Sequence, residues 1–229
     1  MGSVEIHNGQ FNVYSHLVTY GNAADPATTE LIRDEIETLW NEPASIINYK
    51  GISHTVRFQV TAAFEPGISA LTIYQNTDPR NNYFRIEEFA FGNISFVDGL
   101  GCNTGYFKLE NLYAGSTTAA HEYGHTMGLE HPTDLDIRGQ GVPGIMYPRG
   151  TLVDAIYQYN PAGRAGDSSN GGTMHPKFRR VRQKDVQQLA LQRLAFNNKQ
   201  AVLGEFTSVW HPDHSTISPG DVGLPGISG

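Results

Sequence analysis

The sequence predicts an α+β domain, because strand and helix patterns share its first half and a loop-rich stretch follows. Apolar residues alternate with polar ones at Val56, Phe58 and Val60, which indicates a half-buried strand. Apolar residues at helical spacing between 26 and 40 indicate an amphipathic helix. Residues 132–176 are rich in Gly, Pro, Asn and Tyr and predict an irregular region. Such a succession of elements along one chain is typical of the α+β class.

The first half contains the predicted strands. Residues 4–20 carry apolar and β-branched residues around Asn8-Gly9 and predict a hairpin or a first strand. A helix is predicted over 26–40, with Pro26 near its first position and Pro43 beyond its end. Further strands are expected at 55–61, 83–91, 94–97 and 105–110.

The second half predicts two helices joined by loops. A helix is expected at about 117–127 and another at about 183–196, which has apolar residues on one side. We predict one domain over 1–204, with an upper part at about 1–128 and a lower part at about 129–204. Residues 205–229 are rich in Gly, Pro and Ser and predict a loose tail.

Composition narrows the class of protein. The chain has 229 residues, 39% of them hydrophobic, and a net charge of −7, which fits one globular domain and argues against a general nucleic-acid binder. We expect a monomer with no membrane span, since no stretch is apolar for long enough. Residues 1–20 lack the pattern of a signal peptide. A removed signal, a fragment of a larger chain and another export route all stay open.

The most specific motif is His121-Glu-x-x-His125-x-x-Gly128-x-x-His131. Two histidines four residues apart lie on one face of a helix and can share a metal ion. Gly128 suits the left-handed turn that ends a helix, so that the chain can reverse and bring His131 in as a third ligand. Three neutral nitrogens and one open position describe a catalytic zinc site, and Glu122 beside them can act as a base.

This motif resembles that of the metzincin clan of zinc metallopeptidases. The clan also has a turn with a methionine that forms an apolar floor beneath the imidazoles, and Met146 within 144–148 matches it; Met174 is a more distant rival. The resemblance implies a twisted mixed sheet with a backing helix, a zinc helix above the cleft, and an irregular lower subdomain with a C-terminal helix. It also implies that Tyr106–Glu110 is an edge strand that pairs with substrate, although an ordinary edge strand is the alternative.

The subfamily features are mixed. Pro132 after the third histidine resembles the serralysins, whereas Met146-Tyr147-Pro148 resembles the matrixins. Residues 171–185 are similar, more weakly, to peptidase domains of Rhs-type bacterial toxins. That resemblance implies a secreted protease or a toxin effector delivered outside a bacterial cell.

The resemblance implies a zinc-dependent endopeptidase that acts on a protein or peptide. His121, His125 and His131 would hold Zn²⁺, and Glu122 would assist the attack of a zinc-bound water on the peptide carbonyl. Tyr147 and Pro148 would shape the pocket for the side chain after the cut. The alternative is a non-catalytic, zinc-stabilised binding module, but such a module has no need of Glu122 beside the metal. Hydrolysis of a non-peptide amide also stays open.

Four other features have simpler interpretations. Cys102, the only cysteine, is expected to be a small buried residue rather than a thiolate that caps the zinc. The basic run at 177–184 is expected to be solvated rather than to bind an acidic partner. His211 and His214 are expected on the surface, with a metal role as the alternative. Asn93-Ile-Ser95 matches the glycosylation acceptor pattern, which is common by chance.

Overall fold

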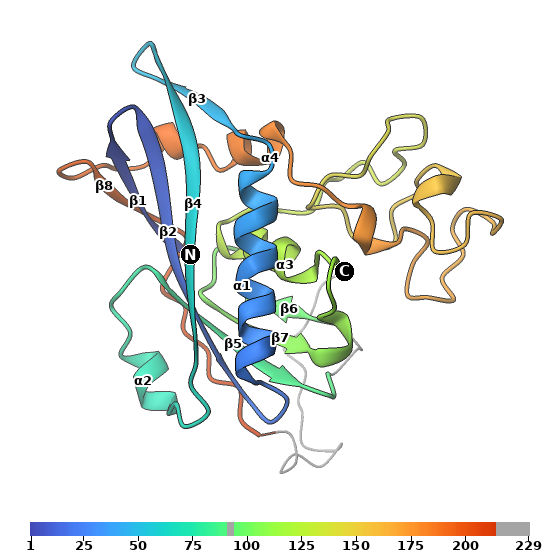
Figure 1. The fold of residues 1–229 in the computed structure, drawn as a ribbon, viewed down its shortest axis with the longest axis horizontal. Coiled ribbons are helices and arrows are strands. Elements are labelled where there is room, and N and C mark those ends of the chain that lie inside the picture. Colours follow the sequence, from blue (N-terminus) through green and yellow to red (C-terminus); the bar gives the residue numbers. More distant parts are fainter. Residues whose placement is uncertain (91–93, 214–229) are drawn as a thin grey trace.

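The fold is built around one mixed sheet in the computed structural model, which describes residues 1–90 and 94–213. Within these residues the sheet has eight strands with the path β3-β4-β2-β5-β7-β6, and β1 pairs with both β2 and β8 (Figure 1). The strands are β1 Gly2–His7, β2 Gln10–Tyr20, β3 Ile46–Tyr49, β4 Ile52–Phe64, β5 Asn81–Glu87, β6 Phe96–Val97, β7 Thr104–Lys108 and β8 Gln200–Leu203. The α-helices are α1 Pro26–Asn41, α2 Ala70–Tyr74, α3 Thr118–Thr126 and α4 Gln183–Gln188. The predicted α+β class is confirmed.

The strand β2 organises the sheet because it pairs with three others. It runs antiparallel to β1, parallel to β4 along ten residue pairs from Gln10↔Thr55 to Thr19↔Phe64, and parallel to β5 at its C-terminal half. Asn8 and Gly9 join β1 to β2 with φ angles of 48° and 74°. Two positive φ angles are what the tight turn of a two-residue hairpin requires. The predicted hairpin is therefore confirmed.

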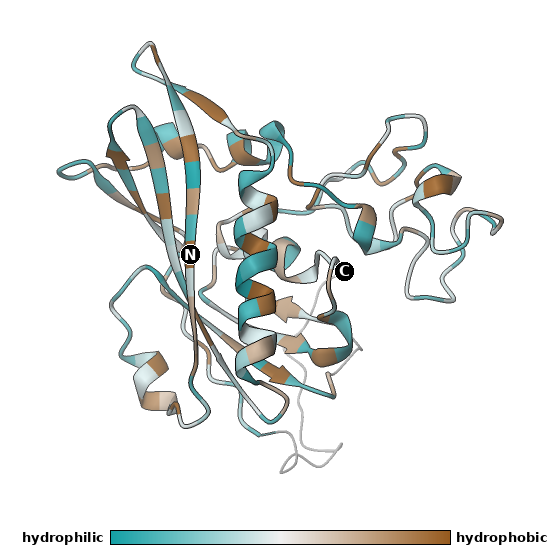
Figure 2. Cartoon of the chain, viewed as in Figure 1, coloured by the Kyte–Doolittle hydropathy of each residue, from teal (hydrophilic) through white to brown (hydrophobic). Residues whose placement is uncertain are grey.

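The main core lies between the sheet and the helices α1 and α3. Alternate residues of the strands supply one side of it, including the fully buried Phe58 and Phe84, and Ile36 and Trp40 of α1 supply the other. In Figure 2, hydrophobic residues (brown) and hydrophilic residues (teal) alternate along α1. The apolar residues that recur at helical spacing on α1 and at every second position on the strands are therefore buried in the same core. The predicted helix over 26–40 is present.

The chain between α3 and α4 contains little regular structure and extends to the side of the sheet (Figure 1). Two short 3₁₀ helices, Ala155–Tyr157 and Pro176–Phe178, lie in this segment. A small separate cluster holds it together, formed by the buried residues Ile137, Tyr147, Val153 and Met174. The predicted loop-rich region is therefore present, with an apolar centre of its own.

The last helix is shorter than predicted. Instead of continuing to 196, α4 ends at Gln188, and a 3₁₀ turn follows at Leu191–Arg193. Ala190 has a φ angle of 49°, which breaks the helical hydrogen-bond pattern. Leu189 and Leu191 are nevertheless buried in the main core, which explains why the apolar pattern continues beyond the helix.

The expected substrate strand at Tyr106–Glu110 is not a free edge. β7 ends at Lys108, and the antiparallel strand β6 pairs with it through Phe96↔Tyr106 and Val97↔Gly105. The backbone N–H of Lys108 also donates to Ser95 Oγ at 3.1 Å. This prediction was wrong because the strand expected at 94–97 folds back to pair with β7, and the sequence does not show which strands are neighbours in the sheet.

Part of the predicted tail packs against the sheet. The backbone N–H groups of Thr207 and Ser208 donate to Asn103 Oδ1. The ring of Trp210 stacks on that of Tyr20, with 5.1 Å between the ring centroids. Residues 205–213 are thus attached rather than loose, and the rest of the tail lies outside the described residues. The boundaries at 1–204 stay predictions. Of the helices that the structure describes, none is long and apolar enough to cross a membrane.

Candidate metal centre

Helix α1 fixes the position of α3, which carries the histidine motif. The Glu35 carboxylate accepts hydrogen bonds from the N–H groups of Thr117 (3.1 Å) and Ala120 (3.2 Å), at the N-terminus of α3. Trp40 Nε1 donates to the carbonyl of Ala120 at 3.0 Å. A carboxylate at this end of a helix satisfies unpaired N–H groups and interacts favourably with the helix dipole. The α1 helix therefore holds α3 by its first turn.

The three predicted ligands converge on one point. His121 and His125 lie one turn apart on α3, and His131 follows the turn that ends the helix. Its Nε2 lies 3.1 Å from Nε2 of His121 and 3.1 Å from Nε2 of His125. Gly128 has a φ angle of 92°, the left-handed conformation that this reversal requires. The expected helix at about 117–127 and the turn after it are both present.

The hydrogen bonds of the two helical histidines determine what the cluster can bind. His121 Nδ1 lies 2.7 Å from the carbonyl of Ile145, and His125 Nδ1 lies 2.6 Å from the carbonyl of Leu129. A carbonyl can only accept, so each Nδ1 must carry the proton and each Nε2 must carry a lone pair. Both lone pairs lie 3.1 Å from Nε2 of His131, so that a cation placed among the three nitrogens could bind to all of them. The donor set therefore fits Zn²⁺, which takes imidazole nitrogens at about 2.0–2.1 Å.

Burial keeps these imidazoles in the neutral form that a metal requires. It lowers the pKa of His125 to about 4 and that of His121 well below the usual value. The pKa of His131 is lowered for the same reason, and the positive charge of Arg179 acts in the same direction. At neutral pH the three Nε2 atoms are thus available as ligands.

Glu122 lies beside the metal ligands in a different environment. Its side chain is only 7% exposed, and it makes no hydrogen bond to any residue that the structure describes. Burial raises the pKa of its carboxyl to about 8, while the positive charges of Arg179 and Arg149 act in the opposite direction. A carboxyl that is buried beside the three imidazoles and pairs with no described residue is placed to accept and return a proton.

Met146 packs directly against the helix that carries the ligands. A Cβ atom added to Gly124 would lie 2.3 Å from Met146 Sδ, so only glycine leaves room for the thioether. Both residues are buried, and Ile145 beside Met146 supplies the carbonyl that orients His121. The rival, Met174, lies instead in the separate cluster of the loop-rich segment. Of the two methionines, Met146 alone thus lies against α3.

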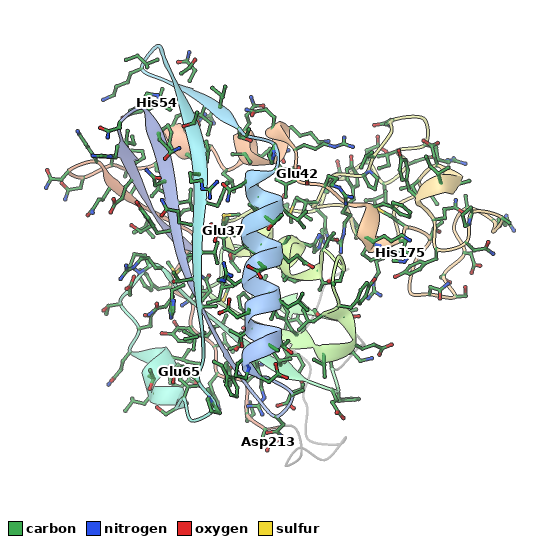
Figure 3. The ribbon with its side chains drawn as sticks, in the orientation of Figure 1. Glu37, Glu42, His54, Glu65, His175 and Asp213 are labelled. Carbon is green, nitrogen blue, oxygen red and sulfur yellow. The ribbon has the colours of Figure 1, made fainter. Side chains whose placement is uncertain are left out.

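A cavity of about 300 Å³ opens beside His121, Glu122 and His131. Pro148 lines it, whereas Tyr147 and His131 line a second cavity, and the backbone carbonyl of Tyr147 accepts from Arg179. That Tyr147 and Pro148 shape the substrate pocket stays a prediction. The far wall comes from the loop-rich segment, where Tyr159 lines the cavity and stacks on His175 at 4.4 Å. His175 is labelled in that segment in Figure 3.

Two arginines of this cavity were not recognised in the sequence. Arg149 and Arg179 both line it, and Arg179 is only 4% exposed. Arg179 lies in the basic run that was expected to be solvated, so the expectation was wrong for this residue. The role of Glu35 was also missed, because it is a single polar residue among the apolar residues of its helix. A carboxylate on the buried face of a helix was the available signal for it.

The other candidates lie away from the metal ligands. Cys102 is buried, as expected, and its thiol contacts the hydroxyls of Thr104 and Thr207. His211 pairs with Asp98 at 2.8 Å and belongs to no group of three metal-ligating side chains within the described residues. Asn93 and His214 lie outside the described residues.

The comparisons with known proteins give only distant likenesses. No protein-family model matches the chain, and no curated protein matches it in sequence. Among solved structures, the archaemetzincin of Methanopyrus kandleri is similar with a TM-score of 0.39 and 14% identity, over 78% of this chain and 95% of that one. Myroilysin is similar with a TM-score of 0.29 and 14% identity, over 80% of this chain and 76% of that one. Likenesses this distant support no statement about activity.

Proposed function

We propose that this protein is a zinc-dependent endopeptidase of the metzincin type. The observation that carries the proposal is the convergence of three imidazole Nε2 atoms at 3.1 Å, with the buried Glu122 carboxyl on the same cavity. No fourth side chain within residues 1–90 and 94–213 joins the three nitrogen ligands, and a set of three describes a catalytic rather than a structural zinc site. Met146 beneath α3 is the proposed methionine of the metzincin turn.

Each residue has a separate role in this proposal. His121, His125 and His131 would hold the metal through Nε2, and the carbonyls of Ile145 and Leu129 keep two of the rings in the required tautomer. When bound, Zn²⁺ supplies Lewis acidity toward a carbonyl oxygen and toward water. Glu122 accepts the proton of the attacking water and then donates it to the leaving amine nitrogen.

The substrate is proposed to be a protein or peptide. The cavity of about 300 Å³ is at the lower end of the range for ligand pockets, ~300–1,000 Å³. A space of this size suits one or two side chains of a chain that continues beyond it. Secretion, or delivery outside the producing cell as a toxin, stays a prediction from the sequence.

Digestion of an unstructured protein such as casein tests the proposal. The protein would be loaded with one equivalent of zinc, and Glu122→Gln would serve as the matched control, since it keeps the size of the side chain but cannot accept a proton. We expect cleavage by the wild type and almost none by Glu122→Gln, with equal zinc content in both. Zinc binding without cleavage of any unstructured protein or peptide would contradict the proposal and favour the zinc-stabilised binding module.

A further inference from the structure

Two arginine side chains line the cavity beside Glu122, and the carboxylates of Glu35 and Glu110 act on them electrostatically without contacting them. Of the described residues that line it, Arg149 and Arg179 are cationic and Glu122 is the one acid. Neither guanidinium lies within 4.0 Å of a carboxylate oxygen of any described residue. A metal ion at the three histidines would add further positive charge. A carboxylate of an occupant would therefore find two guanidinium groups that have no ion-pair partner among the described residues.

Arg179 is fixed in the wall of the cavity. Its Nε donates to Thr117 Oγ1 at 2.9 Å, and its Nη1 donates to the carbonyl of Tyr147 at 3.2 Å. Burial lowers the pKa of this guanidinium to about 10, so it stays charged at neutral pH. Its Nη2 donates to none of the described residues. The side chain is thus rigid and charged, and one of its nitrogens is free.

The backbone of Arg149 is fixed by neighbouring residues, whereas its guanidinium group is not. Its carbonyl accepts from the N–H of Met174 at 3.0 Å. Gly172 approaches the same carbonyl so closely that an added Cβ would lie 2.3 Å from the oxygen. The half-buried guanidinium, in contrast, makes no hydrogen bond or ion pair with a residue of the described ranges. A planar group with five donors, none of them paired with a described residue, is suited to a carboxylate.

The position of these cations relative to the reacting atoms indicates what they would bind. Arg149 follows the Met146–Pro148 turn, and the cavity it lines begins at His121 and Glu122. A peptide whose scissile carbonyl lies at the histidines must place a neighbouring residue in this cavity. We propose that the cavity selects substrates with a carboxylate next to the scissile bond, and that Arg149 is the specificity-determining residue, with Arg179 supporting it. This inference rests on the proposed peptidase function.

The carboxylate can come from an acidic side chain or from the C-terminus of a substrate. Two pairs of fluorogenic peptides separate the two sources. The first pair carries Glu or Gln next to the scissile bond. The second pair ends at that position with either a free C-terminal carboxylate or an amide. We expect kcat/KM to be roughly 10- to 100-fold higher for the peptides whose carboxylate the cavity binds. Equal values for the charged and neutral peptides would overturn the inference while leaving the peptidase in place.

The variant Arg149→Gln assigns the selectivity to one side chain. It should remove most of the preference for the carboxylate, measured as the ratio of kcat/KM for the Glu peptide to kcat/KM for the Gln peptide at one pH. Arg138→Gln is the matched control, because Arg138 is exposed, pairs with Asp136 and lies outside the cavity. Retained preference in Arg149→Gln would show that the arginine does not select substrate.

A binding measurement distinguishes failure of this inference from failure of the proposed function. The Glu122→Gln protein, which should not cleave, would be titrated calorimetrically with the Glu and Gln peptides. We expect the Glu peptide to bind more tightly than the Gln peptide. We expect this difference to disappear when Arg149→Gln is added to the Glu122→Gln protein. Both results would hold even if no peptide were cleaved by the wild type. Equal dissociation constants for the two peptides would overturn the inference whether or not cleavage occurs.

Discussion

The upper and lower parts of this protein are built by different means, although both contribute to the metal centre. The upper part consists of the sheet with α1 and α3, and its side chains follow helical and strand periodicity. The lower part, from Gly128 to α4, has little regular structure. Ile145, Met146 and Val186 join it to the main core, and a small separate cluster and side-chain hydrogen bonds hold the rest. His121, His125 and Glu122 come from the first, and His131, Met146 and the two arginines come from the second.

This difference suggests a division of tasks between the two parts. Reactive groups on a helix keep their relative positions, because the backbone hydrogen bonds of the helix fix them. Groups on loops can differ widely in type while the scaffold stays the same. We therefore expect changes in the upper part to alter the rate of reaction, and changes at the cavity wall of the lower part to alter the choice of substrate.

Glu122→Gln should have the largest effect, since it removes the proposed base from the upper part. We expect kcat to fall by about 10²–10⁴-fold for all peptides. Arg149→Gln, in the lower part, should lower kcat/KM more for substrates with a carboxylate than for neutral ones. Steady-state kinetics on the matched peptides compare the two variants directly. If both variants lowered kcat/KM uniformly, the division of tasks would be wrong.

Arg179 connects the two parts, because it donates to Thr117 at the start of α3 and to the carbonyl of Tyr147. We expect Arg179→Gln to lower the free energy of unfolding by about 2–4 kcal/mol, since buried partners lose charged hydrogen bonds. Its neighbour Arg180 is exposed, and Arg180→Gln should change stability by no more than about 0.5 kcal/mol. Urea denaturation measures the free energy of unfolding of both variants. An equal loss in Arg179→Gln and Arg180→Gln would show that Arg179 does not join the two parts.

Glu35→Gln should weaken the attachment of α3 by about 1–2 kcal/mol, because one amide oxygen cannot replace two carboxylate oxygens. Burial raises the pKa of Glu35 above its usual value of 4.5 in the folded protein. Its contribution is therefore complete below pH 4.5 and declines as the pH rises through the folded pKa. The stability difference between wild type and variant should shrink as the pH rises from about 4.5 through the raised folded pKa. A difference that grows over this range would contradict the raised pKa.

Gly124→Ala should have the smallest effect. An added methyl group would overlap Met146 Sδ, whereas alanine itself favours the helix by as much as ~1 kcal/mol. We expect a net loss of about 1 kcal/mol, measured by thermal unfolding. Gly67→Ala is the control, because nothing lies within 4 Å of the Cβ it would add. A stabilised Gly124→Ala protein would show that Met146 adapts easily and does not support α3.

The features that could be predicted from the sequence are those set by local periodicity or spacing. Helix 26–40, the Asn8-Gly9 hairpin and the convergence of the three histidines all follow from residues within about ten positions of one another. The end of α4 was missed because buried apolar residues continue past the point where the backbone leaves the helix. Pairing of β1 with β8 was missed because it joins strands nearly 200 residues apart.

The arginines show a second limit of the sequence. Arg179 and Arg180 are identical in type and adjacent, yet one is buried at the metal centre and the other is exposed. Which of them turns inward depends on where Thr117 and Tyr147 lie, and this is settled by the packing of the whole lower part. A basic run alone cannot distinguish a solvated segment from a cavity wall.

Zinc K-edge X-ray absorption of the protein with one equivalent of zinc tests the central claim most directly, since both parts must meet at one metal. We predict three imidazole nitrogens at about 2.0–2.1 Å and one small oxygen ligand. His131→Ala should lower the number of imidazoles to two, and Glu122→Gln should leave it unchanged. Four protein ligands around the zinc, or a spectrum that His131→Ala does not alter, would contradict an open catalytic site shared by the two parts.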